Sequence, residues 1–204
     1  MAEEGIIKFD FSCEDNSVVI PGRLLKKINN ARNKLAEMGL IGQYPDGLSY
    51  GNISIRDGKS DQFFITASDT GKIKKADKEH YVKILSCDIE NNFCKYAGQG
   101  LPSSETLTHY IIYKLCDDAE AVIHVHNKQL WHNLKGKTLS TSKSAGYGTV
   151  EMVVEIIRLF EKGLLQKDKL MVMEGHEEGV VCFGQSVGEA MEVLEKAIKT
   201  LSCH

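Results

Sequence analysis

The sequence is poor in the features that would place it outside the ordinary globular proteins. Its 204 residues include only three prolines, and no segment is of low complexity or repeats another. No apolar run approaches the roughly 18 residues that a membrane-spanning helix needs. Lys and Arg total 25 against 28 for Asp and Glu, so the formal net charge of −3 gives no general attraction to nucleic acid or anionic membrane. We therefore expect neither a nucleic acid nor a membrane as a partner.

Disulfide-forming cysteine patterns are also lacking. The six cysteines are scattered along the chain, and no two of them form a Cys-x-x-Cys pair. Such spacing is typical of reduced thiols and not of a disulfide framework. The first residues, Met-Ala-Glu-Glu-Gly, are acidic, whereas a secretory signal begins basic and then becomes apolar. These features predict a cytoplasmic protein.

What the chain contains is a normal globular composition, with 42% hydrophobic and 26% charged residues. A chain of this length buries roughly 70% of its unfolded surface, so it needs no disulfide or structural metal in order to fold. We expect one domain over residues 1–204, in which residues 1–20 form an N-terminal extension.

Apolar periodicity predicts helices that alternate with short strands. Residues 21–38 carry their apolar side chains on one helical stripe, with Pro21 suited to the first turn and Gly39 to the end. Ser103 is expected to cap a second helix, with Glu105 in its first turn. This second helix is expected at 103–115, and two more are expected at 149–164 and 186–201. The expected strands are 50–56, 62–66, 80–86, 93–97, 121–126, 169–174 and 179–183.

The order of these elements predicts an α/β fold. Several strands follow one another as hairpins, so the sheet is expected to be mixed and largely antiparallel, with helices on its faces. The last helix carries the clearest start signal, because Ser186 and Glu189 have the spacing of a capping box.

Two histidines alternate with apolar residues in the strand expected at 121–126. Side chains two positions apart on a strand point to the same face, so His124 and His126 are expected side by side. Two neutral imidazoles in this arrangement can bind a divalent metal. The alternative is that one histidine caps the strand end and the other is solvated, and the pair alone does not decide between them.

His176 is a candidate third ligand. It lies between two expected strands in the segment Gly175-His176-Glu177-Glu178-Gly179, whose glycines allow the backbone to approach a ligand closely. An exposed turn histidine is the simpler local interpretation.

Three short segments are candidates for binding a phosphate. Ser103 and Ser104 precede Glu105 at an expected helix start, where free N–H groups and hydroxyls suit an anion. The segments Gly51-Asn52 and Thr70-Gly71 adjoin expected strands. Each of these segments by itself is also compatible with an ordinary turn.

In combination and in this order, the motifs resemble the class II aldolase/adducin family, close to its L-fuculose-1-phosphate aldolase branch. The resemblance covers roughly residues 21–201. The segments that carry it are Gly51-Asn52-Ile53-Ser54, Ile65-Thr66-Ala67-Ser68-Asp69-Thr70-Gly71, Pro102-Ser103-Ser104-Glu105, Ala121-Val122-Ile123-His124-Val125-His126 and Gly175-His176.

The resemblance implies a three-layer α/β/α sandwich with a mixed, mostly antiparallel central sheet. It also implies a homotetramer with its active sites at subunit interfaces. Zinc, or another divalent transition metal, would be bound by His124, His126 and His176, with Glu105 as a further ligand and as the catalytic acid/base. The residues that match the family's phosphate site are Asn52, Thr70, Gly71, Ser103 and Ser104.

The implied reaction is cleavage of a ketose or deoxyketose 1-phosphate to dihydroxyacetone phosphate and an aldehyde. Dehydration of methylthioribulose 1-phosphate and epimerisation of a sugar phosphate are alternatives that occur on the same scaffold. A third alternative is a non-catalytic adducin-type module, which keeps the fold without the metal ligands. The presence of all three histidines and the glutamate argues against that module.

The sequence departs from the family pattern at three places. Glu177 follows His176, where the family often has Asn-His-Gly. Ser144 stands near the position of the aldolases' tyrosine proton donor, and Tyr147, three residues later, is a candidate pocket residue. The last residues do not match the tail that closes the aldolase pocket. The identity of the proton donor therefore stays open.

Overall fold

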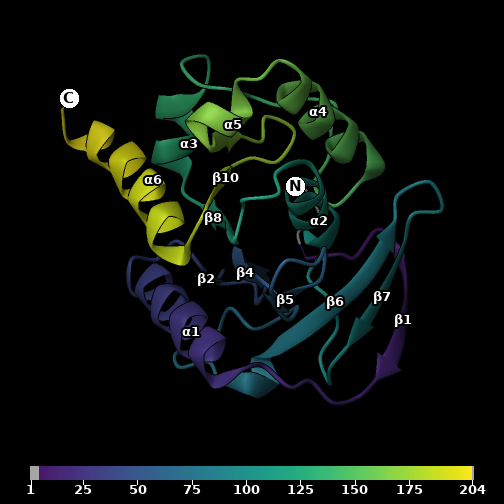
Figure 1. Ribbon diagram of the computed structural model, residues 1–204. Coiled ribbons are helices and arrows are strands. Elements are labelled where there is room, and N and C mark those ends of the chain that lie inside the picture. The colour runs from purple at the N-terminus through teal and green to yellow at the C-terminus, as the bar shows by residue number, and fades with distance from the viewer. Residues whose placement is uncertain (1–4, 204) are drawn as a thin grey trace.

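The computed structural model describes residues 5–203, which build one large sheet covered by helices on both faces (Figure 1). The sheet has eight strands in the order β1-β7-β6-β5-β4-β8-β10-β9. Neighbouring strands are antiparallel except β1 and β7, which are parallel. The strands are β1 Asp10–Asp15, β4 Asn52–Arg56, β5 Phe63–Thr66, β6 Tyr81–Asp88, β7 Phe93–Ala97, β8 Ala121–His126, β9 Leu170–Val172 and β10 Gly179–Gly184. The short strands β2 Gly42–Gln43 and β3 Ser49–Tyr50 pair in a separate two-stranded sheet.

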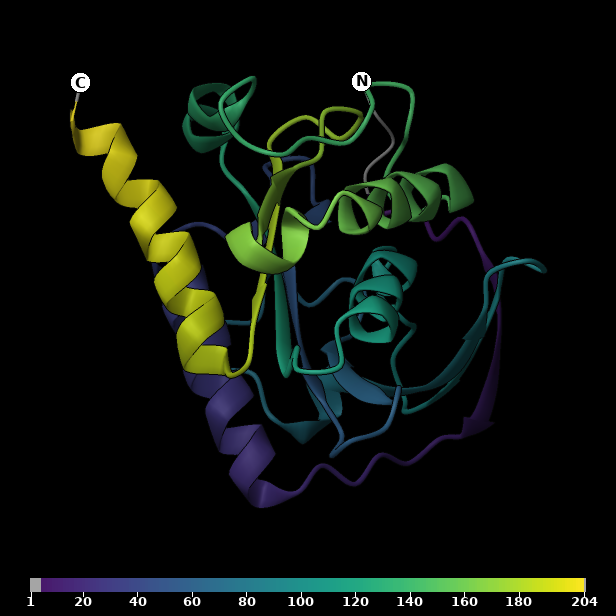
Figure 2. The same cartoon turned by 45° about the horizontal axis from the view of Figure 1, so that its top comes forward.

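The helices divide between the two faces of the large sheet (Figure 2). Their bounds are α1 Gly22–Glu37, α2 Thr106–Leu115, α3 Lys128–Leu134, α4 Val150–Glu161, α5 Leu165–Asp168 and α6 Val187–Lys199, with 3₁₀ turns at Lys78–His80 and Thr200–Cys203. One hydrophobic cluster joins the sheet to α2, α4 and α5, and a second joins it to α1, α3 and α6. The expected three-layer α/β/α fold with a mostly antiparallel sheet is thereby confirmed. Within the described residues, no helix is long and apolar enough to span a membrane.

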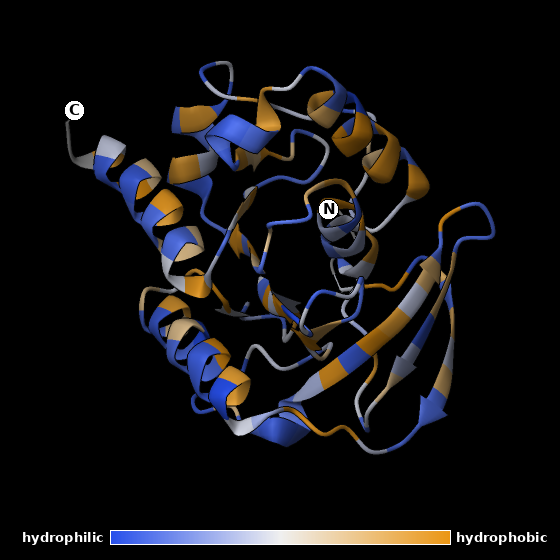
Figure 3. Cartoon of the chain, in the orientation of Figure 1, coloured by the Kyte–Doolittle hydropathy of each residue, from blue (hydrophilic) through white to orange (hydrophobic). Residues whose placement is uncertain are grey.

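Two-sided burial follows from the alternation of side chains along the central strands. In β8, Val122 belongs to the cluster under α2 and α4, whereas Ile123 and Val125 belong to the cluster under α1 and α6. In Figure 3, α1, α4 and α6 each mix hydrophilic and hydrophobic residues, as expected for helices with one buried side. Because β8 alternates in this way, His124 and His126 share the face of Val122, on the side of α2 and α4.

Several element boundaries differ from the sequence-based expectations. Gly51, at a φ of 72°, divides the expected strand 50–56 into β3 and β4. The helix expected at 103–115 begins only at Thr106. Ser103 is therefore not its cap, and Glu105 lies at the N-cap position instead of in the first turn. The helix expected at 149–164 ends at Glu161 and is followed by the separate helix α5.

The capping box expected at the last helix is half correct. The Ser186 side chain accepts a hydrogen bond from the Glu189 backbone N–H at 3.0 Å, as predicted. The Glu189 carboxylate does not return to Ser186 but accepts from the Gln185 N–H at 2.6 Å and pairs with Lys169 at 2.6 Å. The elements without a clear sequence signal include α3, the short strand β2 and the strand β1 inside the expected N-terminal extension.

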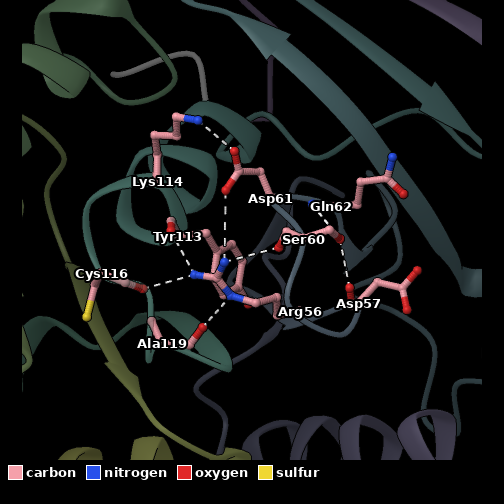
Figure 4. Close-up of polar contacts among 9 residues, drawn as sticks. All are labelled: Arg56, Asp57, Ser60, Asp61, Gln62, Tyr113, Lys114, Cys116 and Ala119. Atoms are coloured by element: carbon pink, nitrogen blue, oxygen red, sulfur yellow. Dashed lines mark hydrogen bonds and ion pairs between the residues drawn. The ribbon is translucent and has the colours of Figure 1, made fainter.

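A buried arginine at the end of β4 holds several neighbouring backbone segments together (Figure 4). Arg56 is 3% exposed and donates hydrogen bonds to backbone carbonyl oxygens of two loops and a helix end. Its acceptors are Ala119 O at 2.7 Å, Tyr113 O at 2.7 Å, Cys116 O at 2.9 Å and Ser60 O at 3.1 Å. Asp61 lies 4.0 Å from the guanidinium and pairs more closely with Lys114, at 2.7 Å.

Candidate metal centre

Three buried histidines meet at the end of β8 opposite Arg56. His124 and His126 come from β8, and His176 comes from the turn between β9 and β10. The Nε2 atoms of His124 and His126 are 3.0 Å apart, and one ring nitrogen of each of the three lies within 4.8 Å of the others. The three side chains are between 1% and 4% exposed. The structure thus brings together the three histidines that the sequence singled out, and the exposed-turn interpretation of His176 is wrong.

Glycines on both sides of His176 permit this convergence. A Cβ atom on Gly175 would lie 2.1 Å from the carbonyl oxygen of Ala145, so any side chain there would push the turn away from its neighbour. Gly179 pairs with His126 in the β10–β8 register, and a Cβ atom on it would lie 3.1 Å from the Nδ1 of His176. The turn is closed by a hydrogen bond from the Gly179 N–H to the His176 carbonyl at 2.9 Å.

Burial keeps the three imidazoles neutral. It lowers the pKa of His124 and of His126 well below the usual value, and in both cases neighbouring histidines add to the effect. Burial also lowers the pKa of His176 to about 3, with a smaller contribution from the charge of Lys8. Neutral imidazoles retain a lone pair for a metal ion, whereas imidazolium does not.

This donor set fits a transition metal of the zinc type. Imidazole nitrogens bind Zn²⁺ at about 2.0–2.1 Å, so two ligands of a tetrahedral ion lie about 3.3 Å apart. The 3.0 Å between the Nε2 atoms of His124 and His126 is close to that separation. A site with three protein nitrogens also leaves coordination positions for a substrate, as catalytic zinc sites do.

Glu105 lies beside the histidines, at the start of α2. Its side chain is 2% exposed, and its Oε1 is 3.5 Å from the Nδ1 of His176. The backbone N–H of Glu105 donates to the Ser103 hydroxyl at 3.3 Å, which fixes the residue at the helix start. A carboxylate in this position can either complete a metal site or exchange a proton with a molecule bound there.

The five candidate phosphate-binding residues line one cleft together with the histidines. This cleft has a volume of about 370 Å³, and Glu105 and Tyr147 also face it. β4 lies next to β8, and Asn52 is the register partner of His124, which explains why this candidate phosphate-binding residue lies beside the histidines. The candidates that the structure brings together here are Asn52, Thr70, Gly71, Ser103 and Ser104.

The loop that carries Thr70 and Gly71 is held from behind. A Cβ atom on Gly71 would lie 1.8 Å from the Gly42 carbonyl oxygen, so only glycine fits. The Gly71 N–H donates to the Ser49 hydroxyl at 3.1 Å. Arg32 of α1 is fully buried and donates from its guanidinium to the Thr70 carbonyl at 2.8 Å. The positive charge of Arg32 therefore lies directly behind the loop of Thr70 and Gly71, which is a candidate for binding an anion.

Residues near the N-terminus, Gly5 and Ile6, also line the cleft beside the candidate pocket residue Tyr147. Their part in the cleft was not predicted from the sequence. Tyr147 is 3% exposed, and its ring lies 4.7 Å from that of His176. The Ile6 N–H donates to the Tyr147 hydroxyl at 3.3 Å, and Lys8 Nζ is 3.6 Å from the centre of the ring. About 140 positions separate these partners in the sequence, and no local pattern marks such a contact.

Comparison with protein families finds one match that spans most of the chain. Residues 35–203 match the family described as the class II aldolase and adducin N-terminal domain. An L-fuculose phosphate aldolase of Methanocaldococcus jannaschii is 28% identical over 164 residues, which cover 74% of this chain and 83% of that protein.

Solved structures with the same fold include several aldolases. An L-fuculose 1-phosphate aldolase superposes with a TM-score of 0.67 at 23% identity and covers 89% of this chain and 84% of its own. The L-fuculose-1-phosphate aldolase of Thermus thermophilus gives 0.63 at 17% identity, with 90% and 93% covered. A sugar-phosphate aldolase of Thermotoga maritima gives 0.61 at 20% identity, with 88% and 93% covered.

Proposed function

The chain belongs to the class II aldolase and adducin family, and on that premise we propose that it is a zinc-dependent aldolase. Its substrate would be a ketose or deoxyketose 1-phosphate, cleaved to dihydroxyacetone phosphate and an aldehyde. Family membership and the aldolase neighbours support a metal-dependent carbon–carbon lyase. The observation that carries the proposal is the convergence of three neutral imidazoles and a buried carboxylate on a cleft lined by anion-binding groups.

His124, His126 and His176 would bind the zinc ion, with Glu105 as a fourth ligand in the empty enzyme. A bound divalent cation supplies positive charge where negative charge develops on the substrate oxygens during bond cleavage. The burial of the three histidines supports this role, since it keeps each imidazole neutral, with one unprotonated nitrogen available to the metal.

Asn52, Thr70, Gly71, Ser103 and Ser104 would hold the phosphate of the substrate. The N-terminal end of α2, which has ten residues, directs its partial positive charge toward this part of the cleft. The buried charge of Arg32 behind Thr70 acts in the same direction. Fixing the phosphate at one end orients the carbon chain relative to the histidines, which converts binding into catalysis.

Glu105 would move the proton that aldol cleavage requires. When the carbon–carbon bond breaks, the hydroxyl of the departing half loses its proton to a base and becomes the aldehyde oxygen. The electron pair of the broken bond stays on the phosphate-bearing half, whose carbon then takes up a proton, so one group that accepts and returns a proton balances the step. The Glu105 carboxylate is buried beside His176 and faces the same cleft, so it is positioned for this transfer. Tyr147 would line the pocket and hold the His176 ring in place by stacking.

We also propose the domain organisation, the assembly and the cellular compartment of the protein. We expect a single catalytic domain over residues 1–204 that assembles as a homotetramer with interfacial sites, as the family resemblance implies. The scattered cysteines, of which Cys13, Cys87, Cys94, Cys116 and Cys182 carry free thiols, favour the cytoplasm as the compartment.

Product analysis of the zinc-loaded protein with a panel of phosphorylated ketoses tests this function. The proposal predicts dihydroxyacetone phosphate and an aldehyde from a ketose 1-phosphate, with far slower turnover of the dephosphorylated sugar. Water loss without carbon–carbon cleavage would instead indicate a dehydratase, and an isomeric sugar phosphate would indicate an epimerase. A protein that binds no metal and converts no member of the panel would contradict the enzymatic assignment.

A further inference from the structure

A tyrosine outside the histidine cluster contacts the ring nitrogen of His126 that points away from that cluster. Tyr44 follows β2, in a turn closed by hydrogen bonds from its own N–H to the Leu48 carbonyl and from the Gly47 N–H back to Tyr44. Its hydroxyl oxygen lies 2.9 Å from His126 Nδ1 and 2.9 Å from an oxygen of Glu178. The three side chains therefore form a chain of two hydrogen bonds, which ends in a carboxylate.

The chemistry of these groups fixes the direction of both hydrogen bonds. A carboxylate accepts hydrogen bonds but donates none, so the Tyr44 O–H must donate to Glu178. The tyrosine has only one proton, and its oxygen can then only accept from His126. His126 must accordingly carry its proton on Nδ1, which leaves a lone pair on Nε2. That Nε2 atom is the one that faces His124 at 3.0 Å.

We propose that Tyr44 and Glu178 are positioning residues that select the metal-binding tautomer of His126. This inference rests on the proposed metal site and deepens it. In other metal sites a ligating histidine donates its second ring N–H to a carboxylate, carbonyl or water, and this contact orients the ring and raises its basicity. Here a tyrosine hydroxyl stands between the imidazole and the carboxylate, so both residues are needed.

The backbone and the packing around this chain hold it in place. Glu178 has a φ of 71°, in the left-handed region that favours glycine, and residues in that region persist where surrounding contacts maintain them. The Tyr44 ring packs at 4.4 Å on that of Tyr50, which in turn lies 5.6 Å from the His126 ring. The conformation of Glu178 thus aims its carboxylate at a tyrosine that is itself wedged against His126.

Zinc affinity measured by competition with a chromophoric chelator tests the proposal. Tyr44→Phe and Glu178→Ala should each weaken zinc binding by roughly 10- to 100-fold, the usual cost of removing such a supporting contact. Tyr50→Phe is the matched tyrosine control, because the Tyr50 hydroxyl contacts the Gly39 carbonyl at 3.3 Å and not a histidine. Glu177→Gln is the matched acidic control, since Glu177 is exposed and lies 3.5 Å from Lys128. Both controls should bind zinc as tightly as the wild type.

Imidazole nitrogen NMR of the metal-free protein gives a readout that depends on neither activity nor bound zinc. In the wild type, His126 should be protonated at Nδ1 and unprotonated at Nε2. In Tyr44→Phe the two tautomers should mix, while circular dichroism shows that the fold is retained. If Tyr44→Phe does not fold, Glu178→Ala serves the same measurement, because it leaves the tyrosine ring in the packing.

The outcomes separate this inference from the proposed function. A protein with the expected tautomer that turns over no sugar phosphate would keep the inference and overturn the aldolase. An Nε2-protonated His126 in the wild type would overturn the inference, whatever the activity. So would variants whose zinc affinity and tautomer both match those of Tyr50→Phe and Glu177→Gln.

Discussion

The two ends of β4 carry buried polar clusters of opposite character. At one end, Arg56 donates to four backbone carbonyl oxygens, and each of these acceptors belongs to a loop or helix end that the arginine holds together (Figure 4). At the other end, Asn52 pairs in register with His124, and the histidine nitrogens converge on one another and on a cleft. Both clusters are almost completely buried.

The difference lies in where the polar atoms point. Donors and acceptors around Arg56 match one another, so the cluster is complete without any further molecule, as buried structural groups usually are. Around His124 and His126, two imidazoles direct the same kind of atom at each other across 3.0 Å. Such an arrangement is stabilised when a cation occupies the space between lone pairs. Burial alone therefore does not distinguish the two clusters, whereas the convergence of like atoms on a cleft does.

Replacement of a histidine should have the largest effect at the cleft end. His124→Ala removes one of the three nitrogen ligands that we propose for the metal ion. We expect the zinc content to fall from about one ion per chain to near zero and turnover to be lost. Elemental analysis of the purified protein measures this, with circular dichroism as the control for folding. Full zinc content together with full activity in His124→Ala would eliminate the assigned site.

Glu105→Gln should have the next largest effect and separates proton transfer from metal binding. Glutamine keeps the shape of the side chain but cannot accept a proton at neutral pH. We expect turnover to fall by roughly 10²–10⁴, the usual contribution of a positioned general base. Zinc content should stay near normal, since the three histidines remain. Steady-state kinetics alongside metal analysis measures both quantities, and turnover within a few-fold of the wild type would contradict the role.

The sequence sufficed for the parts of this fold that depend on local pattern. Period-two alternation located the strand with His124 and His126, and it correctly placed both on one face. The hairpin around His176 was also predicted from local pattern, because Gly175 and Gly179 mark a tight turn between two expected strands. The three-layer arrangement and the grouping of five separate motifs into one cleft came from the family resemblance and not from local physics.

Other elements and contacts could not be predicted from the sequence, because they depend on residues that are distant in the chain. β1 pairs with β7 in parallel, about 80 residues away, and its exposed residues carry no clear alternation. Tyr44 reaches His126 across 82 positions, so nothing beside Tyr44 marks its role. The late start of α2 has a local cause, since Ser103 and Glu105 use their backbone groups in a turn before the helix begins.

Arg56→Met is the counterpart at the other end of β4. Methionine fills most of the space but donates no hydrogen bond, so several carbonyl oxygens lose their donor at once. Each buried unsatisfied group costs roughly 1–3 kcal/mol, and we expect a loss of about 3–5 kcal/mol in the free energy of unfolding. Urea denaturation measures it. Zinc affinity of the folded protein should not change, and a loss of zinc binding without a loss of stability would reverse our comparison.

Arg32→Met tests a second buried arginine, which belongs to the cleft end. Arg32 donates to the Thr70 carbonyl, behind the loop that we assign to phosphate binding. Loss of this buried positive charge removes its attraction for a bound phosphate, so KM for the sugar phosphate should rise roughly 10-fold, which corresponds to about 1.4 kcal/mol of binding free energy. The turnover number should change much less, since Arg32 contacts no reacting group. An unchanged KM would show that this arginine, like Arg56, serves only the fold.

Ser186→Ala should have the smallest effect and calibrates the comparison with an ordinary local contact. The Ser186 hydroxyl accepts the Glu189 N–H at the start of α6, and Ser186 belongs to neither of the two clusters of β4. Loss of an N-cap costs about 0.5–2 kcal/mol, because one helical N–H loses its partner but regains water. Urea denaturation should therefore show a loss of about 1 kcal/mol, with KM, turnover and zinc affinity all unchanged. Suppose that Ser186→Ala and Arg56→Met lost the same amount of stability. The carbonyl oxygens that Arg56 contacts would then have found other hydrogen-bond donors in Arg56→Met. The contrast between a completed cluster and a convergent one would then lose its energetic basis.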